Sequence, residues 1–302
     1  MIRGRRHYSL AVRRANGDVE TLCEPLNSLF TGAWRRIPLI RGIVVLVETL
    51  FLGIKCLNRS AVIASADQSD DDEEMPKWVL AGTVAISLAF GIGLFFIAPL
   101  FAVRAFDEAI TSDILSNFIE GVMRLVILVA YVSAIGMMSD VRRVFAYHGA
   151  EHMAVHTHEA GLPLEVEHVR RFPTAHPRCG TAFLLTVMVV AILAFAFLGR
   201  PDLEWRIASR ILLIPAIAAF SYEVIRFCGA HSTNPATKAV TFLGLALQRL
   251  TTRRPDDQQI EVAIHAMETA LAADEERQPQ FPSNFSEEAG TGASQGQIQS
   301  EA

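Results

Sequence analysis

A short polar segment, residues 147–161 (YHGAEHMAVHTHEAG), concentrates side chains that bind metal ions. It contains four of the nine histidines and two glutamates: His148, Glu151, His152, His156, His158 and Glu159. Each residue of an α-helix advances by about 100°, so the first three of these histidines and Glu159 share one narrow face. Histidines four residues apart stack on successive turns and can hold one divalent metal ion. The segment therefore predicts a metal-binding helix.

The order of residues in this segment also matches an inverted zinc-hydrolase motif. His148, Glu151 and His152 form H-x-x-E-H, in which the histidines bind zinc and the glutamate acts as general base. A polar helix face that happens to contain histidine would explain the histidine pair alone. The density of histidine and glutamate favours metal binding instead. We therefore expect zinc ligands at His148 and His152 and a catalytic residue at Glu151, with His156 and Glu159 as possible further ligands.

A catalytic zinc ion takes three protein ligands and keeps one open position, so the histidine pair needs a third ligand from elsewhere. The loop before the third apolar segment offers His176 and Cys179, with Arg178 between them. Cys179 is expected at the N-terminus of the following helix, where a thiol has a lowered pKa. Inert packing of Cys179 and a helix-start position for His176 are the alternative interpretations.

Glu223, in the fourth apolar segment, is the other candidate for the third ligand. A glutamate further along the chain is the usual third ligand of the inverted motif. Placing a carboxylate at the centre of a membrane costs about 2.5–3.5 kcal/mol, so Glu223 needs a partner or a function. An ion pair with Arg226, three residues later, is the structural alternative to metal binding.

The composition indicates a membrane protein. Hydrophobic residues make up 51% of the 302 residues, and they collect in blocks. A helix needs about 20 predominantly apolar residues to cross a bilayer. Four blocks approach or exceed this length, at residues 78–103, 114–138, 181–198 and 207–228. The sequence therefore predicts a mainly α-helical, polytopic membrane bundle of about four spans, within a membrane domain at residues 78–228.

The distribution of arginine predicts the orientation of these spans, because cytoplasmic loops carry an excess of Lys and Arg. Residues 1–36, the His-rich segment at 140–180 and the region after residue 228 are all arginine-rich, whereas the short connections at 104–113 and 199–206 are not. We therefore expect a multi-pass protein of the cell's inner (cytoplasmic) membrane with both termini in the cytoplasm. The histidine cluster would then lie just below the inner leaflet.

The N-terminal regions are predicted to form a small arm, an interfacial helix and a linker. Asn16-Gly17 between two β-prone runs predicts a β-hairpin in the arm, residues 1–36. Residues 37–57 carry Arg41, Glu48 and Lys55 seven residues apart, which favours an interfacial or re-entrant helix over a lone span. Residues 58–77 include a run of acidic residues and are predicted to form a solvated linker.

The C-terminal regions are predicted to be cytoplasmic. Residues 229–275 contain two amphipathic helices, at 235–250 and 256–272. Asp256 followed by Gln259 resembles a capping box at the start of the second. Residues 276–302 are rich in Gln, Ser, Gly and Glu and are expected to be disordered.

Several longer motifs make the sequence similar to the YqhQ family of bacterial membrane proteins. They are YHGAEHMAVHTHEAG, VRRFPTAHPRCGTAFLL, SYEVIRF and LQRLTTRRPDDQQIEVAI, while IPLIRGIVVLVETLFLGIKCLNRSA resembles the first helical segment of the family. The family is regarded as predicted metal-dependent enzymes, which is what the resemblance implies here. By matching motif, it points to the following positions: His148, Glu151, His152, His156, His176, Arg178, Cys179, Glu223, Arg226, Asp256 and Asp257.

The resemblance extends to about Met267 but weakens at the N-terminus. The family usually opens with GGQAVIEGVMMRG, and only Met1-Ile2-Arg3-Gly4 resembles the end of that phrase.

Three functions follow from these observations. The first is a membrane-embedded, zinc-dependent hydrolase at the cytoplasmic face, acting on a lipid-linked or membrane-anchored molecule or on a nearby peptide, with membrane lipid as its surroundings. The second is a non-catalytic assembly or regulatory protein with a structural metal ion or none, which binds protein partners through its N-terminal arm and C-terminal helices. The third is a transporter with Glu48, Glu120 and Glu223 along its pathway, although few spans and no internal repeat argue against it. Nucleic acid is not an expected partner, because membrane topology accounts for the basic residues.

Overall fold

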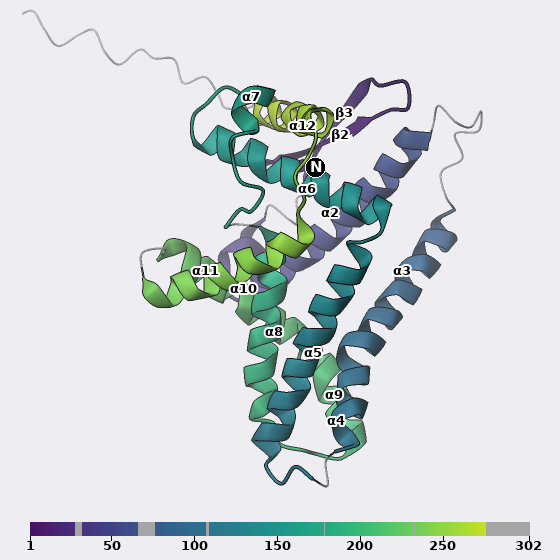
Figure 1. Ribbon diagram of the computed structural model, residues 1–302, viewed down its shortest axis with the longest axis vertical. Coiled ribbons are helices and arrows are strands. Elements are labelled where there is room, and N and C mark those ends of the chain that lie inside the picture. Colours follow the sequence, from purple (N-terminus) through teal and green to yellow (C-terminus); the bar gives the residue numbers. More distant parts are fainter. Residues whose placement is uncertain (28–31, 66–75, 107–108, 178, 232–233, 276–302) are drawn as a thin grey trace, which may run out of the picture.

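The computed structural model describes residues 1–27, 32–65, 76–106, 109–177, 179–231 and 234–275. Figure 1 shows two parts: a bundle of long helices at one end, and at the other a cap of strands and helices. Helices dominate both parts, as predicted. The histidine helix lies in the cap, across the end of the bundle.

The N-terminal arm folds as the predicted hairpin with one additional strand. Strands β1 (Ile2–Arg3), β2 (His7–Arg13) and β3 (Val19–Pro25) form an antiparallel sheet in the order β1-β2-β3. Gly17 has a φ of 96° in the turn between β2 and β3. Asn16 Oδ1 also accepts a hydrogen bond of 2.9 Å from the backbone N–H of Asp18. These two residues close the hairpin, as the Asn-Gly pair predicts.

The helix expected at residues 37–57 is longer than predicted. A 3₁₀ turn, η1 (Ala33–Arg36), is followed by helix α2 (Ile40–Ser65). The first part of the predicted linker at 58–77 is therefore helical, because its residue Ile63 packs with Leu52 and Cys56 of α2 in a core shared with β2. The acidic run of that linker, at residues 66–75, lies outside the described residues.

The regularly spaced charges of α2 each bind a different part of the cap or bundle. Arg41 donates to Glu223 with 2.7 Å between Nε and Oε1, and Lys55 Nζ lies 2.5 Å from Glu24. Glu48 is bound by Arg3 at 2.9 Å and by Arg35 at 3.0 Å. Large apolar side chains of α2 remain exposed: Val47, Leu50, Phe51 and Leu57. This division into an ion-paired face and an exposed apolar face is typical of an interfacial helix.

Two rods in the bundle have the length and composition of membrane spans. Helix α3 (Lys77–Ile92), the π-helical η2 (Gly93–Ile97) and α4 (Ala98–Arg104) are continuous, and helix α5 spans Asp113–Ile135. Within the described residues, Ala81–Arg104 and Asp113–Ile135 are apolar helices of 24 and 23 residues, long enough to cross a bilayer. They match the first two predicted spans.

The third and fourth predicted spans are shorter or bent in the structure. Helix α8 (Gly180–Ala196) has 17 residues, or about 25 Å at 1.5 Å per residue, against a hydrocarbon core of about 30 Å. The fourth segment is broken into α9 (Leu203–Leu212) and α10 (Ile214–Ala230), with a bend of 43°. Pro215 explains the break, because its ring prevents continuation of the preceding helix. The described chain thus offers two spans, or three if the bent pair is one span.

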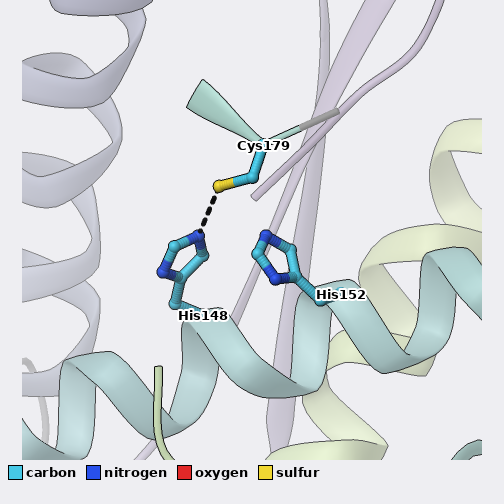
Figure 2. Close-up of side chains that lie close together, drawn as sticks. All are labelled: His148, His152 and Cys179. Atoms are coloured by element: carbon cyan, nitrogen blue, oxygen red, sulfur yellow. Dashed lines mark hydrogen bonds between the residues drawn. The ribbon is translucent and has the colours of Figure 1, made fainter. Parts of the chain in front are cut away.

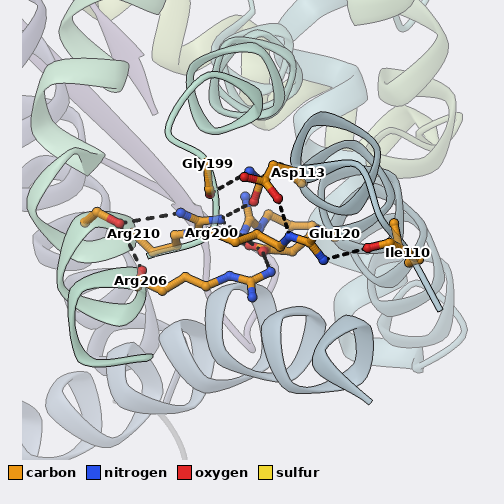
Figure 3. Close-up of polar contacts among 10 residues, drawn as sticks. Ile110, Asp113, Glu120, Gly199, Arg200, Arg206 and Arg210 are labelled. Carbon is orange, nitrogen blue, oxygen red and sulfur yellow. Dashed lines mark hydrogen bonds and ion pairs between the residues drawn. The ribbon is translucent and has the colours of Figure 1, made fainter. Parts of the chain in front are cut away.

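A buried ionic cluster joins α5 to α9 within the bundle (Figure 3). Glu120 accepts hydrogen bonds from Arg124 at 2.8 Å, from Arg210 at 3.1 Å and from Arg206 at 3.4 Å. Glu120 and Arg124 are each 1% exposed, Arg210 is 0% exposed and Arg206 is 4% exposed. One carboxylate therefore anchors three guanidinium groups away from solvent, which ties the two helices together.

The cap is built around helix α12 (Asp257–Glu275), which packs between α6 (Ser139–Glu159) and β2. One face of α12 packs on the small side chains of α6, and the opposite face packs on the sheet. Asp256 Oδ1 accepts from the Gln259 N–H at 2.8 Å, and Gln259 Oε1 accepts from the Asp256 N–H at 3.0 Å. This reciprocal pair confirms the predicted capping box. The short helix α7 (Val166–Val169) packs on α6 and α12, and helix α11 (Pro235–Thr251) packs on the bundle helices α8, α10 and α5.

Candidate metal centre

Helix α6 presents its histidines to the loop before α8 because its opposite face is committed to packing. Ala150, Met153 and Ala154 are each 0% exposed and contact α12. Gly149 is required on the same helix, since an added Cβ would lie 2.3 Å from the carbonyl oxygen of Arg253. The linker between α11 and α12 therefore runs directly against α6. These contacts fix the rotation of α6 and the direction of its histidines.

His148, His152 and Cys179 lie together at the start of α8 (Figure 2). One donor atom from each lies within 4.8 Å of the others. His148 Nε2 is 3.2 Å from Cys179 Sγ, and the two imidazole rings have centroids 4.3 Å apart. Two imidazoles and a thiol are the ligand types that zinc prefers. We call these three residues the first group.

Backbone carbonyl groups orient both rings of the first group. His148 Nδ1 donates to the carbonyl of Thr251 at 3.0 Å, and His152 Nδ1 donates to the carbonyl of Thr174 at 2.6 Å. A carbonyl oxygen can only accept, so the proton of each neutral ring lies on Nδ1. Each Nε2 is then the nitrogen left to bind a metal ion. This is the arrangement in which metal-binding histidines are usually held.

The environment of Cys179 favours its thiolate. Cys179 is the N-cap residue of α8, and its sulfur accepts from the Thr181 N–H at 3.4 Å. Burial opposes ionisation, but hydrogen bonds with His148 and His152 outweigh it and lower the pKa of Cys179 to about 5. Burial also opposes the charged form of His148 and by itself would lower its pKa. The hydrogen bond to Cys179 outweighs burial, so the pKa of His148 is raised. A thiolate is the form of cysteine that binds metals.

The lowered pKa predicts how metal-free protein reacts with iodoacetamide. The thiolate is the nucleophile, so the alkylation rate of Cys179 should rise with pH through a midpoint near 5. An ordinary thiol, with a pKa of about 8.5, is still mostly protonated at pH 6. Peptide mass spectrometry at pH 6 should therefore find Cys179 alkylated well before the exposed Cys23. Equal labelling of the two cysteines at this pH would contradict the described environment.

A second group of three potential ligands lies one turn further along α6. His156, Glu159 and His176 each offer an atom within 4.8 Å of the others. His176 Nε2 is 3.2 Å from Glu159 Oε2, and His156 Nε2 donates to the carbonyl of Ala175 at 2.9 Å. Burial lowers the pKa of His176, although Glu159 acts in the opposite direction. The 3.2 Å contact between Glu159 and His176 gives these two residues a hydrogen-bonding role that needs no metal ion.

Gln248 of α11 holds the loop that carries His176, and sequence reasoning missed it. Its Oε1 accepts from the His176 N–H at 2.8 Å, and its Nε2 donates to the His176 carbonyl at 2.9 Å. Gln248 is 0% exposed. The sequence indicated only a polar position in an amphipathic helix. A polar residue on the packed side of that helix is the one feature that pointed to a buried hydrogen-bonding role.

The structure does not bring Glu223 to the histidines, which corrects its expected role as third ligand. Glu223 binds Arg41 of α2 and accepts from the Leu39 N–H at 3.1 Å. The expected structural partner, Arg226, is exposed. Cys179, rather than Glu223 or His176, stands with His148 and His152. Arg178 lies outside the described residues.

An apolar cavity adjoins the first group. It has a volume of about 450 Å³ and lies between α2, β2, α6 and α12. The α6 wall supplies polar groups, namely Arg143, Tyr147, His148 and Glu151. The side chain of Glu151 is 39% exposed, and its Oε2 lies 3.8 Å from the N-terminal nitrogen of Met1. His148 therefore connects the first group to a space large enough for part of a ligand.

Fold and site together define a mainly helical protein with helices apolar enough to span a membrane and a cluster of histidine and cysteine in its cap. The chain belongs to the family described as "Protein of unknown function (DUF1385)", whose profile matches residues 37–273. It is 30% identical over 282 residues to "Uncharacterized protein YqhQ" of Bacillus subtilis (strain 168). The aligned residues cover 90% of this chain and 89% of that protein. No solved structure matches. These findings confirm the resemblance to the YqhQ family.

Proposed function

We propose that the chain is a membrane-embedded, metal-dependent hydrolase whose zinc ion is bound by His148, His152 and Cys179. The observation that carries this proposal is the convergence of three donor atoms within 4.8 Å, with both rings held through Nδ1 by backbone carbonyls. Two nitrogen donors and one sulfur donor suit zinc, and three ligands leave a position open, as in catalytic zinc sites. A structural zinc site would be closed by a fourth ligand.

The membrane topology is part of this proposal. We infer that α3–α4, α5, α8 and the bent pair α9–α10 each carry the chain from one side of the cytoplasmic membrane to the other, since the residues after α8 contact the start of α5. The arginine-rich N-terminal arm, α6 and the C-terminal helices then lie on the cytoplasmic side, in agreement with the positive-inside rule. The first group would stand just below the inner leaflet, with both chain termini in the cytoplasm.

The residues of the chain divide the work of hydrolysis. A zinc ion bound at the first group would polarise the substrate and acidify a water molecule. The Thr251 and Thr174 carbonyls keep the two imidazole rings in place. We assign Glu151 as the general base that takes a proton from attacking water, because it borders the cavity that His148 also borders.

The hydrolase proposal is tested by isotope incorporation, which detects hydrolysis of any component of a substrate mixture. Zinc-loaded protein is incubated with lipid extract from its host in H₂¹⁸O, and products are examined by mass spectrometry. We expect ¹⁸O in a product formed by the wild type. Glu151→Gln should retain zinc but lower the rate by about 10²–10⁴-fold, the usual contribution of a general base. Equal rates for the two proteins, or no ¹⁸O incorporation by the wild type, would rule out this mechanism.

Thiol chemistry at Cys179 is a second candidate function, favoured by the 3.2 Å contact with His148. A cysteine beside a histidine that is oriented by a third group is the arrangement of nucleophilic cysteine enzymes. Here the Thr251 carbonyl is the third group. The two functions differ in their response to metal: zinc would be required for the hydrolase, whereas it would block the thiol. Chelation therefore distinguishes them, since it should abolish the first activity and preserve the second.

Two other functions have less support. A structural metal site in an assembly protein needs four ligands, and the first group supplies three among the described residues. A transport pathway through Glu48, Glu120 and Glu223 would leave these carboxylates available to ions. Instead, each is bound by at least one arginine.

A further inference from the structure

We propose that the cap binds an anionic phospholipid, with the phosphate headgroup among four arginines and part of the hydrocarbon chain in the apolar cavity beside His148. The proposal names the substrate class of the proposed hydrolase and in that respect rests on it. The cap has two neighbouring cavities, one basic and one apolar, and they share one lining residue.

The first of these cavities is basic. It is an open surface depression of about 540 Å³ between the first turns of α6 and the linker from α11 to α12. Its charged lining consists of four arginines and one aspartate: Arg142, Arg143, Arg253, Arg254 and Asp256. The uncharged lining residues are Ser139, Ala146 and Gln259. Its formal charge is therefore +3. Arginine forms paired hydrogen bonds with phosphate, so a phosphate group is the anion that this lining fits.

Within the part of the chain that the structure describes, no carboxylate forms an ion pair with the four arginines of this cavity. Arg253 Nη1 donates to the carbonyls of Arg249 at 2.9 Å and Thr252 at 3.0 Å, and Arg254 Nη2 donates to the carbonyl of Arg170 at 3.2 Å. Carbonyl oxygens carry no net charge. The Asp256 carboxylate is engaged as the cap of α12. An added anion would therefore gain charge-assisted hydrogen bonds without displacing a carboxylate.

The second cavity is the apolar one of about 450 Å³ beside His148. Side chains from four elements line it, including Leu10, Val12, Cys56, Leu57 and Val262. Burying hydrocarbon against such a surface is favourable by about 25 cal/mol per Å². A free phosphate gains nothing from this cavity, whereas a lipid chain does.

Arg143 lines both cavities, so they meet on one side of α6. A ligand that bridges them must carry an anionic group next to an apolar chain. The position also suits a membrane lipid, because α5, a candidate span, ends at Ile135 and α6 begins at Ser139. The basic cavity then lies at headgroup depth. His148 and Glu151 line the apolar cavity near this junction, which would place a bond close to the headgroup beside the proposed zinc site.

The proposal is tested by titrating purified full-length protein in a non-ionic detergent and measuring binding by native mass spectrometry. The probes are phosphatidylglycerol, phosphatidylcholine with the same acyl chains, and glycerol phosphate as a headgroup without chains. We expect phosphatidylglycerol to bind at least about tenfold more tightly than either of the others, since each loses one of the two contributions. Equal binding of the two lipids would overturn the anionic site. If glycerol phosphate bound as tightly as phosphatidylglycerol, the site would recognise a free phosphate group, and the proposal of a lipid ligand would be wrong.

Variants test each cavity with a matched control. Arg142→Gln and Arg254→Gln should each weaken phosphatidylglycerol binding about tenfold, whereas the exposed Arg171→Gln, outside both cavities, should not. Gly53→Leu should fill the apolar cavity, because Gly53 lines it and an added Cβ there meets nothing within 4 Å. Gly82→Leu is its control, since Gly82 has the same freedom outside the cavity. If Gly53→Leu bound the lipid as tightly as the wild type, the hydrocarbon chain would not occupy the apolar cavity.

One further variant separates this inference from the proposed function. His152→Ala removes a proposed zinc ligand but changes neither cavity lining. It should lose zinc and retain phosphatidylglycerol binding. Loss of lipid binding by this variant, with its fold intact, would overturn the two-cavity site, whereas unchanged zinc content would count against the metal centre alone.

Discussion

Replacing His148, His152 or Cys179 by alanine is expected to lower the zinc affinity of the purified protein by more than about 100-fold. Loss of an outer hydrogen-bonding partner alone costs about 10–100-fold in metal affinity, and removal of a ligand should cost more. The measurement is a competition titration of metal-free protein with zinc against a chelator of known affinity. The effect should be similar for all three variants, because each removes one of three donors at the same point.

Two controls make this prediction specific. His158→Ala removes an exposed histidine from the same helix, outside both groups of potential ligands, and should bind zinc as the wild type does. Glu223→Gln should also retain zinc, because Glu223 binds Arg41. Normal zinc affinity in Cys179→Ala would refute the assigned ligand set. Loss of zinc in Glu223→Gln would restore the ligand that the sequence suggested.

Replacing Glu120 by glutamine should destabilise the bundle by about 3–5 kcal/mol, the usual cost of removing one partner from a buried ion pair. Glu120 is 1% exposed and accepts from three arginines. The substitution would remove the negative charge that the three buried guanidinium groups share. Thermal unfolding in detergent, with helicity followed by circular dichroism, measures the loss.

The matched control for Glu120 is Asp113, which also lies on α5 and pairs with Arg200 at 2.6 Å. The side chain of Asp113 is 53% exposed, and exposed ion pairs contribute about 0–1 kcal/mol. Asp113→Asn should therefore change stability little. Similar losses for the two variants would show that burial does not determine the importance of the Glu120 cluster.

The histidine helix was predictable because its information is local. Spacing by four residues places His148 and His152 on one face of any α-helix, and the structure keeps them there. The third donor was harder to assign, because it returns from a loop whose path depends on tertiary contacts. Gln248 holds that loop through the backbone of His176. A pattern of residue types does not show which loop meets which helix face.

The carbonyls that orient the histidines could not be predicted at all. Thr251 and Thr174 act through backbone oxygen atoms, and every residue type has such an atom. Glu223 illustrates the opposite case. Its cost inside an apolar segment correctly predicted a need for a partner. The hydrogen-bonding partner, Arg41, lies 182 residues away, whereas the nearby Arg226 acts on Glu223 through its charge.

The bundle shows the limits of counting apolar residues. Composition identified α5 and the α3–α4 rod, because an apolar run of this length is typical of a helix that can span a membrane. It did not show that the segment containing Pro215 bends by 43° or that α8 is short. The acidic run after residue 65 also led to a predicted linker that starts too early, at residue 58. The helix α2 continues to Ser65, because Cys56 and Ile63 pack on the sheet.

The most direct test of the proposed metal centre is zinc X-ray absorption spectroscopy of the purified, zinc-loaded protein. The assigned ligands predict one sulfur atom at about 2.3 Å and two imidazole nitrogen atoms at about 2.0–2.1 Å, with a lighter atom at the open position. Cys179→Ser should remove the sulfur contribution. A zinc ion bound without sulfur, or protein that retains no zinc, would contradict the assignment of His148, His152 and Cys179 as its ligands.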